Sequence, residues 1–155
     1  MVKRITGALV KPIDQGAWKD LADLADVDLT SEDPDSPVEH VFAHTVTTGW
    51  RAAGPGIQTI RLRFRRPVQL TRILVLFEEM ARPRTQEFVL AWRAAGEMMD
   101  VEILRQQFTF APPDTIIERE DYRVHLIDVS ELALSITPDI SGGQAIATLQ
   151  EFCVA

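Results

Sequence analysis

Two groups of side chains in this sequence could bind a small polar molecule. Trp50 and Arg51 lie in the glycine-rich stretch GWRAAGPG. Arg82 and Arg84 flank Pro83 in a second stretch, which separates two predicted strands. An exposed tryptophan offers a flat apolar face to a sugar ring, and arginine donates in-plane hydrogen bonds to hydroxyl groups or carboxylates. If both stretches are loops at one end of a domain, they predict a ligand-binding cleft. The alternative is that Trp50 packs beneath its loop as part of the core.

Carboxylates near predicted strand ends raise the question of hydrolysis. A glycosidase needs two carboxyl groups about 5–9.5 Å apart across a cleft. Adjacent strand residues point to opposite faces, so Glu78 and Glu79 do not form such a pair if their strand continues. Together with Glu87, they are interpreted as solvated strand ends that pair with Arg82 or Arg84. We therefore predict no catalytic residues.

No metal ion and no cofactor is predicted, although calcium stays an alternative. His40 and His44 are four residues apart in a β-rich stretch, which separates them by roughly 13 Å on a strand. Zinc–histidine bonds are about 2.0–2.1 Å long, so one ion cannot reach both. Calcium binds six to eight oxygen atoms, and five acids lie on or near one loop: Asp26, Asp28, Glu32, Asp33 and Asp35. A solvated acidic loop is the simpler interpretation.

The elements that would position these residues are mostly strands. Residues 57–65 alternate, with Ile60, Leu62 and Phe64 on one side and an arginine stripe on the other: Arg61, Arg63 and Arg65. The stripe is interpreted as a solvated sheet face paired with glutamates on a neighbouring strand. The alternative is a surface for an acidic partner or a second subunit. Further strands are predicted at Leu70–Phe77, Glu87–Trp92, Val101–Phe110, Tyr122–Ile127, Leu132–Ile136 and Ala145–Val154.

Short strands separated by proline and glycine predict a mostly β, antiparallel jelly-roll β-sandwich. Residues 17–26 have helical spacing and predict one short N-terminal helix. Val38–Thr48 is β-rich and reads as a strand, residues 49–56 read as a loop, and Pro67 is expected to end the strand before it.

Length and charge limit the possible functions. The chain has 155 residues, which predicts a single domain over residues 1–155, and its net charge of −7 argues against bulk nucleic-acid binding. The arginines concentrate in residues 51–93, which keeps a local anionic site possible. Cys153 is the only cysteine, so no intramolecular disulfide can form. No stretch has the pattern of a signal sequence or a membrane span, so we expect a cytoplasmic protein without a membrane partner.

Three longer stretches carry a family resemblance: Trp50–Val68, Ile73–Glu97 and Tyr122–Ala155. In the first, WRAAGPGIQTIRLRFRRPV, a tryptophan and a loop precede an alternating strand that ends in Pro-Val. The second pairs two strands, and the third closes with the strand ATLQEFCVA. These features resemble discoidin-type domains, also called coagulation-factor C-type domains, of the galactose-binding-like superfold. The resemblance implies a cleft among the loops at one end, but the disulfide of the extracellular members and the usual Asp-Gly turn are missing.

The leading hypothesis is a non-catalytic binding module for a carbohydrate or a similar small polar ligand. Trp50, Arg51, Arg82 and Arg84 are its predicted ligand-binding residues. The alternative is a protein-interaction or assembly module, including a homo-oligomer, with no small ligand. A carboxylate-based hydrolase ranks last.

Overall fold

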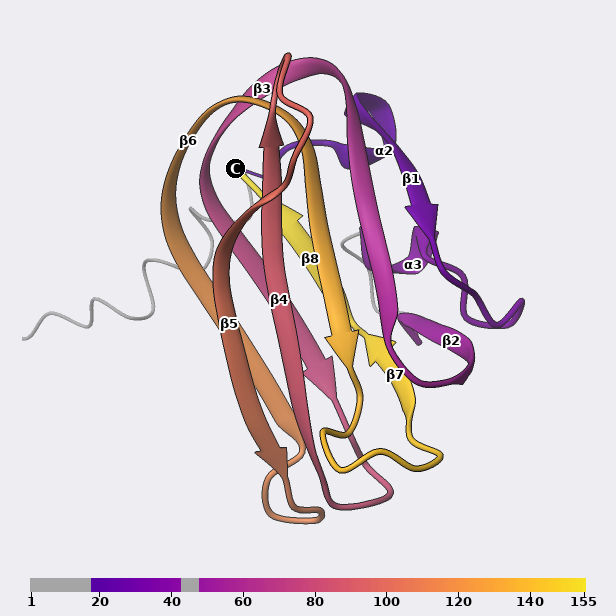
Figure 1. The fold of residues 1–155 in the computed structure, drawn as a ribbon. Coiled ribbons are helices and arrows are strands. Elements are labelled where there is room, and N and C mark those ends of the chain that lie inside the picture. Colours follow the sequence, from indigo (N-terminus) through magenta and orange to yellow (C-terminus); the bar gives the residue numbers. More distant parts are fainter. Residues whose placement is uncertain (1–17, 43–47) are drawn as a thin grey trace, which may run out of the picture.

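The computed structural model describes residues 18–42 and 48–155, and strands dominate this part of the chain (Figure 1). In these ranges no helix has the length and apolar character needed to cross a membrane. The elements are α2 (Leu21–Leu24), β1 (Ala25–Leu29), α3 (Glu39–Phe42), β2 (Trp50–Pro55), β3 (Gln58–Glu78), β4 (Arg84–Ala94), β5 (Val101–Phe110), β6 (Ile117–Thr137), β7 (Ile146–Leu149) and β8 (Glu151–Val154). The named strands pair antiparallel, so the predicted mostly β sandwich with a short helix near its start is confirmed.

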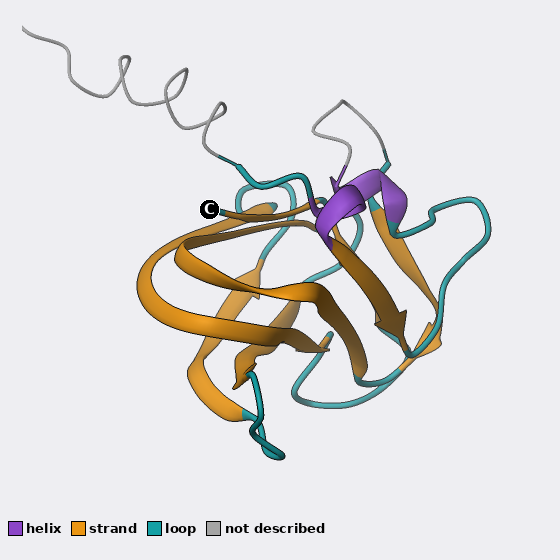
Figure 2. Ribbon diagram, turned by 90° about the horizontal axis from the view of Figure 1, so that it is seen from above, coloured by secondary structure: helices purple, strands orange, loops and turns teal. Residues whose placement is uncertain are grey.

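The long strands β3 and β6 each contribute to both layers of the sandwich. The first part of β3 pairs with β1 and with the last part of β6, and its later part pairs with β8 and with the first part of β6. One layer therefore has the order β1-β3-β6-β4-β5, and the other combines β8 with the remaining halves of β3 and β6. From above, the bent strands wrap around a central space that side chains fill (Figure 2). A separate small sheet pairs β2 with β7.

The expectation that Pro67 ends a strand is wrong, because β3 continues through it. The pairing of β3 with β6 shifts register around this point, where Val68 lies opposite Val129. Asp128, next to Val129, has a positive φ of 58°. Irregularities of this kind bend a strand and let it pass from one layer to the other. β6 is likewise one strand where the sequence predicts two: Tyr122–Ile127 and Leu132–Ile136.

The core lies between the two layers and is built from alternate side chains. Ile60, Leu62 and Phe64 of β3 are buried, which confirms the predicted buried side of residues 57–65. Phe77 from the later part of β3 meets Phe88 of β4, with ring centroids 5.3 Å apart. Contacts of this kind between facing layers fix the positions of the strand ends, and hence of the loops that follow them.

The start of the chain is less helical than its spacing predicts. α2 covers only Leu21–Leu24, and the Asp20 carboxylate accepts a hydrogen bond from the backbone N–H of Asp23 at 3.4 Å. The next five residues form β1 and pair with the edge of β3. Backbone hydrogen bonds to an existing sheet edge outweigh a weak local helical preference. Residue 17 of the predicted helix lies outside the described residues.

Two further local expectations are wrong. Part of the predicted strand Val38–Thr48 forms the helix α3 instead, and residues 43–47 lie outside the described ranges. The predicted loop over residues 49–56 contains β2, which pairs with β7. Gly49 precedes β2 with a φ of 71°, and a Cβ there would lie 2.4 Å from the carbonyl oxygen of Leu149. Only glycine allows this close approach, which brings β2 and β7 together.

Candidate functional site

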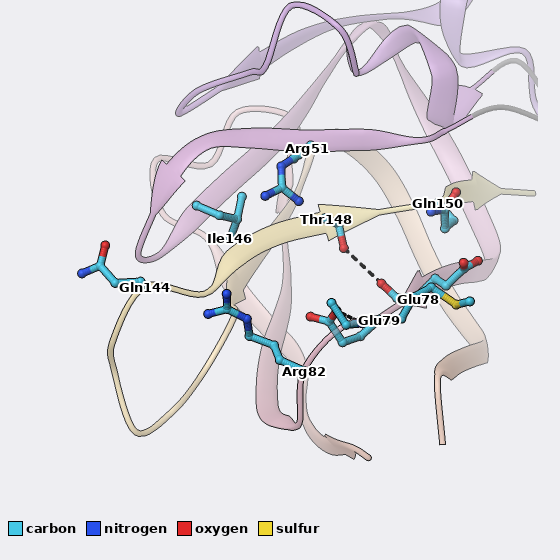
Figure 3. Close-up of a pocket in the computed structure, with 10 residues that line it drawn as sticks. Arg51, Glu78, Glu79, Arg82, Gln144, Ile146, Thr148 and Gln150 are labelled. Carbon is cyan, nitrogen blue, oxygen red and sulfur yellow. Dashed lines mark hydrogen bonds between the residues drawn. The ribbon is translucent and has the colours of Figure 1, made fainter. Parts of the chain in front are cut away.

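A polar cleft of about 340 Å³ opens between the small β2–β7 sheet and the connection from β3 to β4 (Figure 3). Four charged side chains line it: Arg51, Glu78, Glu79 and Arg82. Arg51 belongs to β2, Glu78 is the last residue of β3, and Glu79 and Arg82 lie in the connection that follows. The bend of β3 and the pairing of β2 with β7 thus assemble the cleft from segments far apart in the sequence.

Arg51 and Arg82, two of the four predicted ligand-binding residues, meet in this cleft. Both are exposed, and within the described residues neither guanidinium group has a hydrogen bond or an ion pair. In Figure 3 both side chains reach toward the part of the cleft marked by Ile146 of β7. Free guanidinium groups retain all their donors for a ligand.

Trp50 does not provide the exposed stacking face that the sequence suggests. Its side chain is buried, with only 1% of its surface exposed, and its indole N–H donates to the carbonyl oxygen of Ser31 at 3.2 Å. Alternation along β2 turns Trp50 and Ala52 inward and leaves Arg51 outside. The alternative interpretation, a core position beneath the surface, is therefore the correct one for Trp50.

Arg84 is buried as well, and its guanidinium group binds three protein acceptors. It donates to Glu79 Oε1 at 2.7 Å, to Gln86 Oε1 at 3.0 Å and to the carbonyl oxygen of Pro138 at 2.7 Å. It also lies over the Phe110 ring, 4.7 Å from the centroid. Arg84 therefore anchors the loops around the cleft instead of facing a ligand.

Glu79 is held in place by the same contacts. Besides the Arg84 bond, its carboxylate accepts a hydrogen bond from the backbone N–H of Ala81 at 3.0 Å. Burial raises the pKa of Glu79, but the bonds from Arg84 and from backbone N–H groups outweigh it and lower the pKa overall. An ionised Glu79 thus fixes the turn that carries Arg82.

The far side of the cleft holds residues that sequence reasoning missed. The Thr148 hydroxyl donates to the carbonyl oxygen of Glu78 at 3.3 Å, which ties β7 to the end of β3. Gln150 lines the same side, beside the Glu78 side chain (Figure 3). The signal was present in β7, where Ala147 and Leu149 are buried and the alternate residues Ile146 and Thr148 line the cleft.

The other carboxylate and metal candidates are occupied by protein contacts. Glu87 accepts hydrogen bonds from Arg105 at 2.6 Å and from Gln107 at 2.9 Å. His40 lies in α3, with Nδ1 3.3 Å from the carbonyl oxygen of Gly49, and His44 lies outside the described residues. Across residues 18–42 and 48–155, no group of three or more His, Cys, Asp or Glu side chains could hold a metal ion.

Four of the five acids proposed for calcium have partners within the protein. Asp26 and Asp28 form ion pairs with the arginine stripe, Glu32 accepts the backbone N–H of Val38 at 2.6 Å, and Asp33 accepts that of Asp35 at 3.0 Å. These contacts shape the loop before α3.

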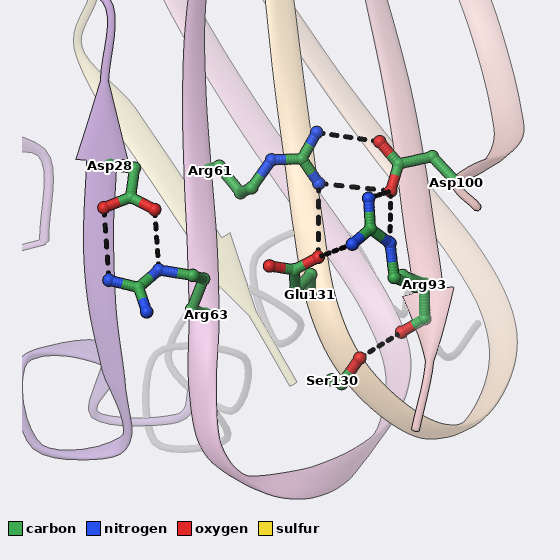
Figure 4. Close-up of polar contacts among 7 residues, drawn as sticks. All are labelled: Asp28, Arg61, Arg63, Arg93, Asp100, Ser130 and Glu131. Atoms are coloured by element: carbon green, nitrogen blue, oxygen red, sulfur yellow. Dashed lines mark hydrogen bonds and ion pairs between the residues drawn. The ribbon is translucent and has the colours of Figure 1, made fainter. Parts of the chain in front are cut away.

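The arginine stripe is internally neutralised, as its simpler interpretation predicts. Arg63 pairs with Asp28 at 2.6 Å and Arg65 with Asp26 at 3.1 Å, both on the neighbouring strand β1. Arg61 pairs with Asp100 at 2.7 Å (Figure 4). The stripe therefore offers little unmatched charge to an acidic protein partner.

A buried polar chain continues inward from Arg84. Gln86 donates to Glu118 Oε1 at 3.1 Å, and both side chains are buried. Burial, together with repulsion from Glu120, raises the pKa of Glu118 to about 8. Glu118 is therefore protonated at neutral pH. Its Oε2 and the Tyr122 hydroxyl are also buried and lack a hydrogen-bond partner among the described residues.

Comparison with solved structures identifies the class of fold. The chain is similar to the family 32 carbohydrate-binding module of C. perfringens NanJ in complex with galactose, with TM-score 0.64, 11% identity and coverage of 88% of this chain and 96% of that one. The CBM32 of AlyQ in complex with 4,5-unsaturated mannuronic acid is similar with TM-score 0.60 and 14% identity. This match covers 86% of this chain and 95% of that one. An F5/8 type C domain from Bacteroides fragilis is similar with TM-score 0.62 and 19% identity, and the match covers 90% of this chain and 96% of that domain.

These similarities confirm the predicted discoidin-like, galactose-binding-like fold. At identities this low, the similarity establishes the fold, and the ligand has to be inferred from the residues of the site. Sequence comparison finds no matching family model and no matching curated protein.

Proposed function

We propose that this domain is a non-catalytic carbohydrate-binding module and that the cleft around Arg51 and Arg82 is its ligand site. The structurally similar modules support the class of ligand, since their structures contain galactose, a GalNAc–galactose disaccharide or an unsaturated mannuronic acid. The observation that carries the proposal is the pair of exposed arginines without partners in one open polar cleft.

The cleft has the mixture of groups that a sugar ring requires. Arg51 and Arg82 can donate to ring hydroxyl groups, and Gln150 can both donate and accept. Ile146 adds a small apolar surface for the C–H face of a sugar. Without an aromatic platform, hydrogen bonding carries most of the interaction, so we expect modest affinity.

Hydrolysis is disfavoured by the state of the carboxylates. Glu78 and Glu79 line the same cleft, but the Glu79 carboxylate is committed to Arg84 and is held ionised. A glycosidase needs one carboxyl group with a raised pKa to act as the acid. Glu118 has a raised pKa, but it is buried and does not line the cleft.

The proposal is tested by a glycan array followed by calorimetry on the best mono- and oligosaccharides. Arg51→Ala and Arg82→Ala are each expected to weaken binding about tenfold, because each removes charge-assisted hydrogen bonds. Arg66→Ala is the matched control: Arg66 is also exposed and unpaired in the described structure, but it lies outside the cleft. No binding by the wild-type domain, or equal losses in all three variants, would refute this site.

A further inference from the structure

Most arginines in the described part of the chain are paired with acids. Arg61, Arg63, Arg65, Arg72, Arg84, Arg93, Arg105 and Arg119 all form ion pairs. Arg51, Arg66, Arg82 and Arg123 form none among the described residues, although the protein carries a net charge of −7. Of these four, only Arg51 and Arg82 line a common cleft. The cleft is therefore a place where positive charge is left unmatched.

The two glutamates of the cleft do not neutralise these arginines. Glu79 is bound to Arg84, which matches its charge from the protein interior. Glu78 forms no ion pair among the described residues and lies on the Gln150 side, whereas Arg51 and Arg82 reach toward Ile146 (Figure 3). The cleft thus has a basic side and a side that can accept hydrogen bonds.

We infer that the ligand of this cleft is an acidic sugar, a hexuronate residue whose carboxylate binds between Arg51 and Arg82. This inference rests on the proposed function and specifies its substrate class. A carboxylate accepts two parallel N–H bonds from a guanidinium group, which a neutral hydroxymethyl group cannot do. The ring hydroxyl groups remain free to donate to Glu78 and to bond with Gln150 on the other side.

The test compares sugars that differ only at carbon 6. Calorimetry at low salt measures the binding of tetrasaccharides of galacturonate, mannuronate and glucuronate, and of the same chains with each carboxyl group reduced to an alcohol. At least one acidic chain is expected to bind about tenfold or more tightly than its reduced form. Added salt weakens the acidic chain and leaves the neutral one unchanged. Because the whole protein is acidic, non-specific attraction does not favour this result.

Charge-removing variants locate the effect. Arg51→Gln and Arg82→Gln are each expected to remove most of the preference for the acidic chain, while Arg66→Gln keeps it. Circular dichroism confirms that each variant is folded. Equal affinity for acidic and reduced chains, still lost with Arg51→Gln, overturns the inference and leaves the proposed function standing. No binding of any chain overturns both. A sulfated neutral oligosaccharide is measured alongside. If it binds more tightly than every uronate chain, the inference that the ligand's acidic group is a carboxylate is overturned.

Discussion

Arginine has opposite roles on two surfaces of this domain. On the outer face of the larger sheet, Arg61 and Arg93 share the carboxylates of Asp100 and Glu131 in a closed cluster (Figure 4). In the cleft, the guanidinium group of Arg51 has no partner among the described residues. The same side chain thus serves the fold in one place and stays available for binding in the other. Two unmatched arginines in one cleft mark a candidate site better than the residue type alone does.

The cluster on the sheet satisfies its charges through geometry that the strands impose. Arg61 donates to both oxygens of Asp100, at 3.1 and 2.7 Å, and Arg93 reaches the same carboxylate at 2.9 Å. The bonds from Arg61, and to a lesser degree Arg93, lower the pKa of Asp100 against the opposing effect of partial burial. The cleft lacks such a network, so a ligand can complete it.

The largest effect is expected where a buried arginine is lost. Arg84→Met leaves Glu79, Gln86 and the carbonyl oxygen of Pro138 without their donor, and should lower the free energy of unfolding by about 3 kcal/mol. Arg82→Met, two residues earlier, removes no protein contact and should leave Tm unchanged. Denaturant unfolding of both variants measures the contrast. Equal losses would show that Arg82 also has a structural role.

Glu118 extends this comparison to pH. Its folded pKa of about 8 lies above the unfolded value near 4.5, so the native state keeps a proton that the unfolded state releases. The free energy of unfolding should therefore decrease as the pH rises from about 4.5 to 8. Glu118→Gln cannot ionise and should flatten this dependence, whereas Glu97→Gln, at an exposed turn, should not. Parallel curves for wild type and Glu118→Gln contradict the assignment.

Substitutions in the sheet cluster of Arg61, Arg93, Asp100 and Glu131 should change the stability less. Arg61 and Asp100 are only partly buried, with 25% and 27% of their side-chain surfaces exposed, so a double-mutant cycle should give a coupling of about 1 kcal/mol. Because the folded pKa of Asp100 is lowered, the coupling is present above about pH 4, the usual unfolded value, and is lost as the pH falls below it. Thermal unfolding of the cycle at pH 7 and pH 2.5 checks both points. A coupling that persists at pH 2.5 rules out the ion pair as its source.

The smallest effect is expected for Arg63, whose pair with Asp28 is open to solvent on both sides. Arg63→Gln should leave Tm unchanged at physiological salt, because exposed ion pairs are screened and cost side-chain entropy. Differential scanning calorimetry at low and high salt measures it. A clear decrease in Tm at high salt would mean that Arg63 stabilises the fold through packing and not through its charge.

The sequence predicts the strands well where the buried side is formed locally. β5 matches its expected bounds, Val101–Phe110, and alternation identified the buried face of residues 57–65. The sequence predicts poorly where contacts with residues far along the chain determine the local structure. Trp50 lies in a glycine-rich stretch that resembles a loop, but pairing with Leu149 makes it a buried strand residue. Arg82 and Arg84 look equivalent in sequence, but Arg84 begins β4, is buried and binds Glu79, Gln86 and the distant Pro138.

The central claim is that the unmatched arginines of the cleft, Arg51 and Arg82, bind the ligand, and that the matched arginines of the sheet cluster, Arg61 and Arg93, hold the fold. Calorimetry of the tightest-binding oligosaccharide with two double variants tests it most directly. Arg51→Gln/Arg82→Gln should abolish binding without lowering Tm, and Arg61→Gln/Arg93→Gln should lower Tm while the affinity stays within twofold of wild type. If the sheet variant loses binding and the cleft variant retains it, the claim is contradicted.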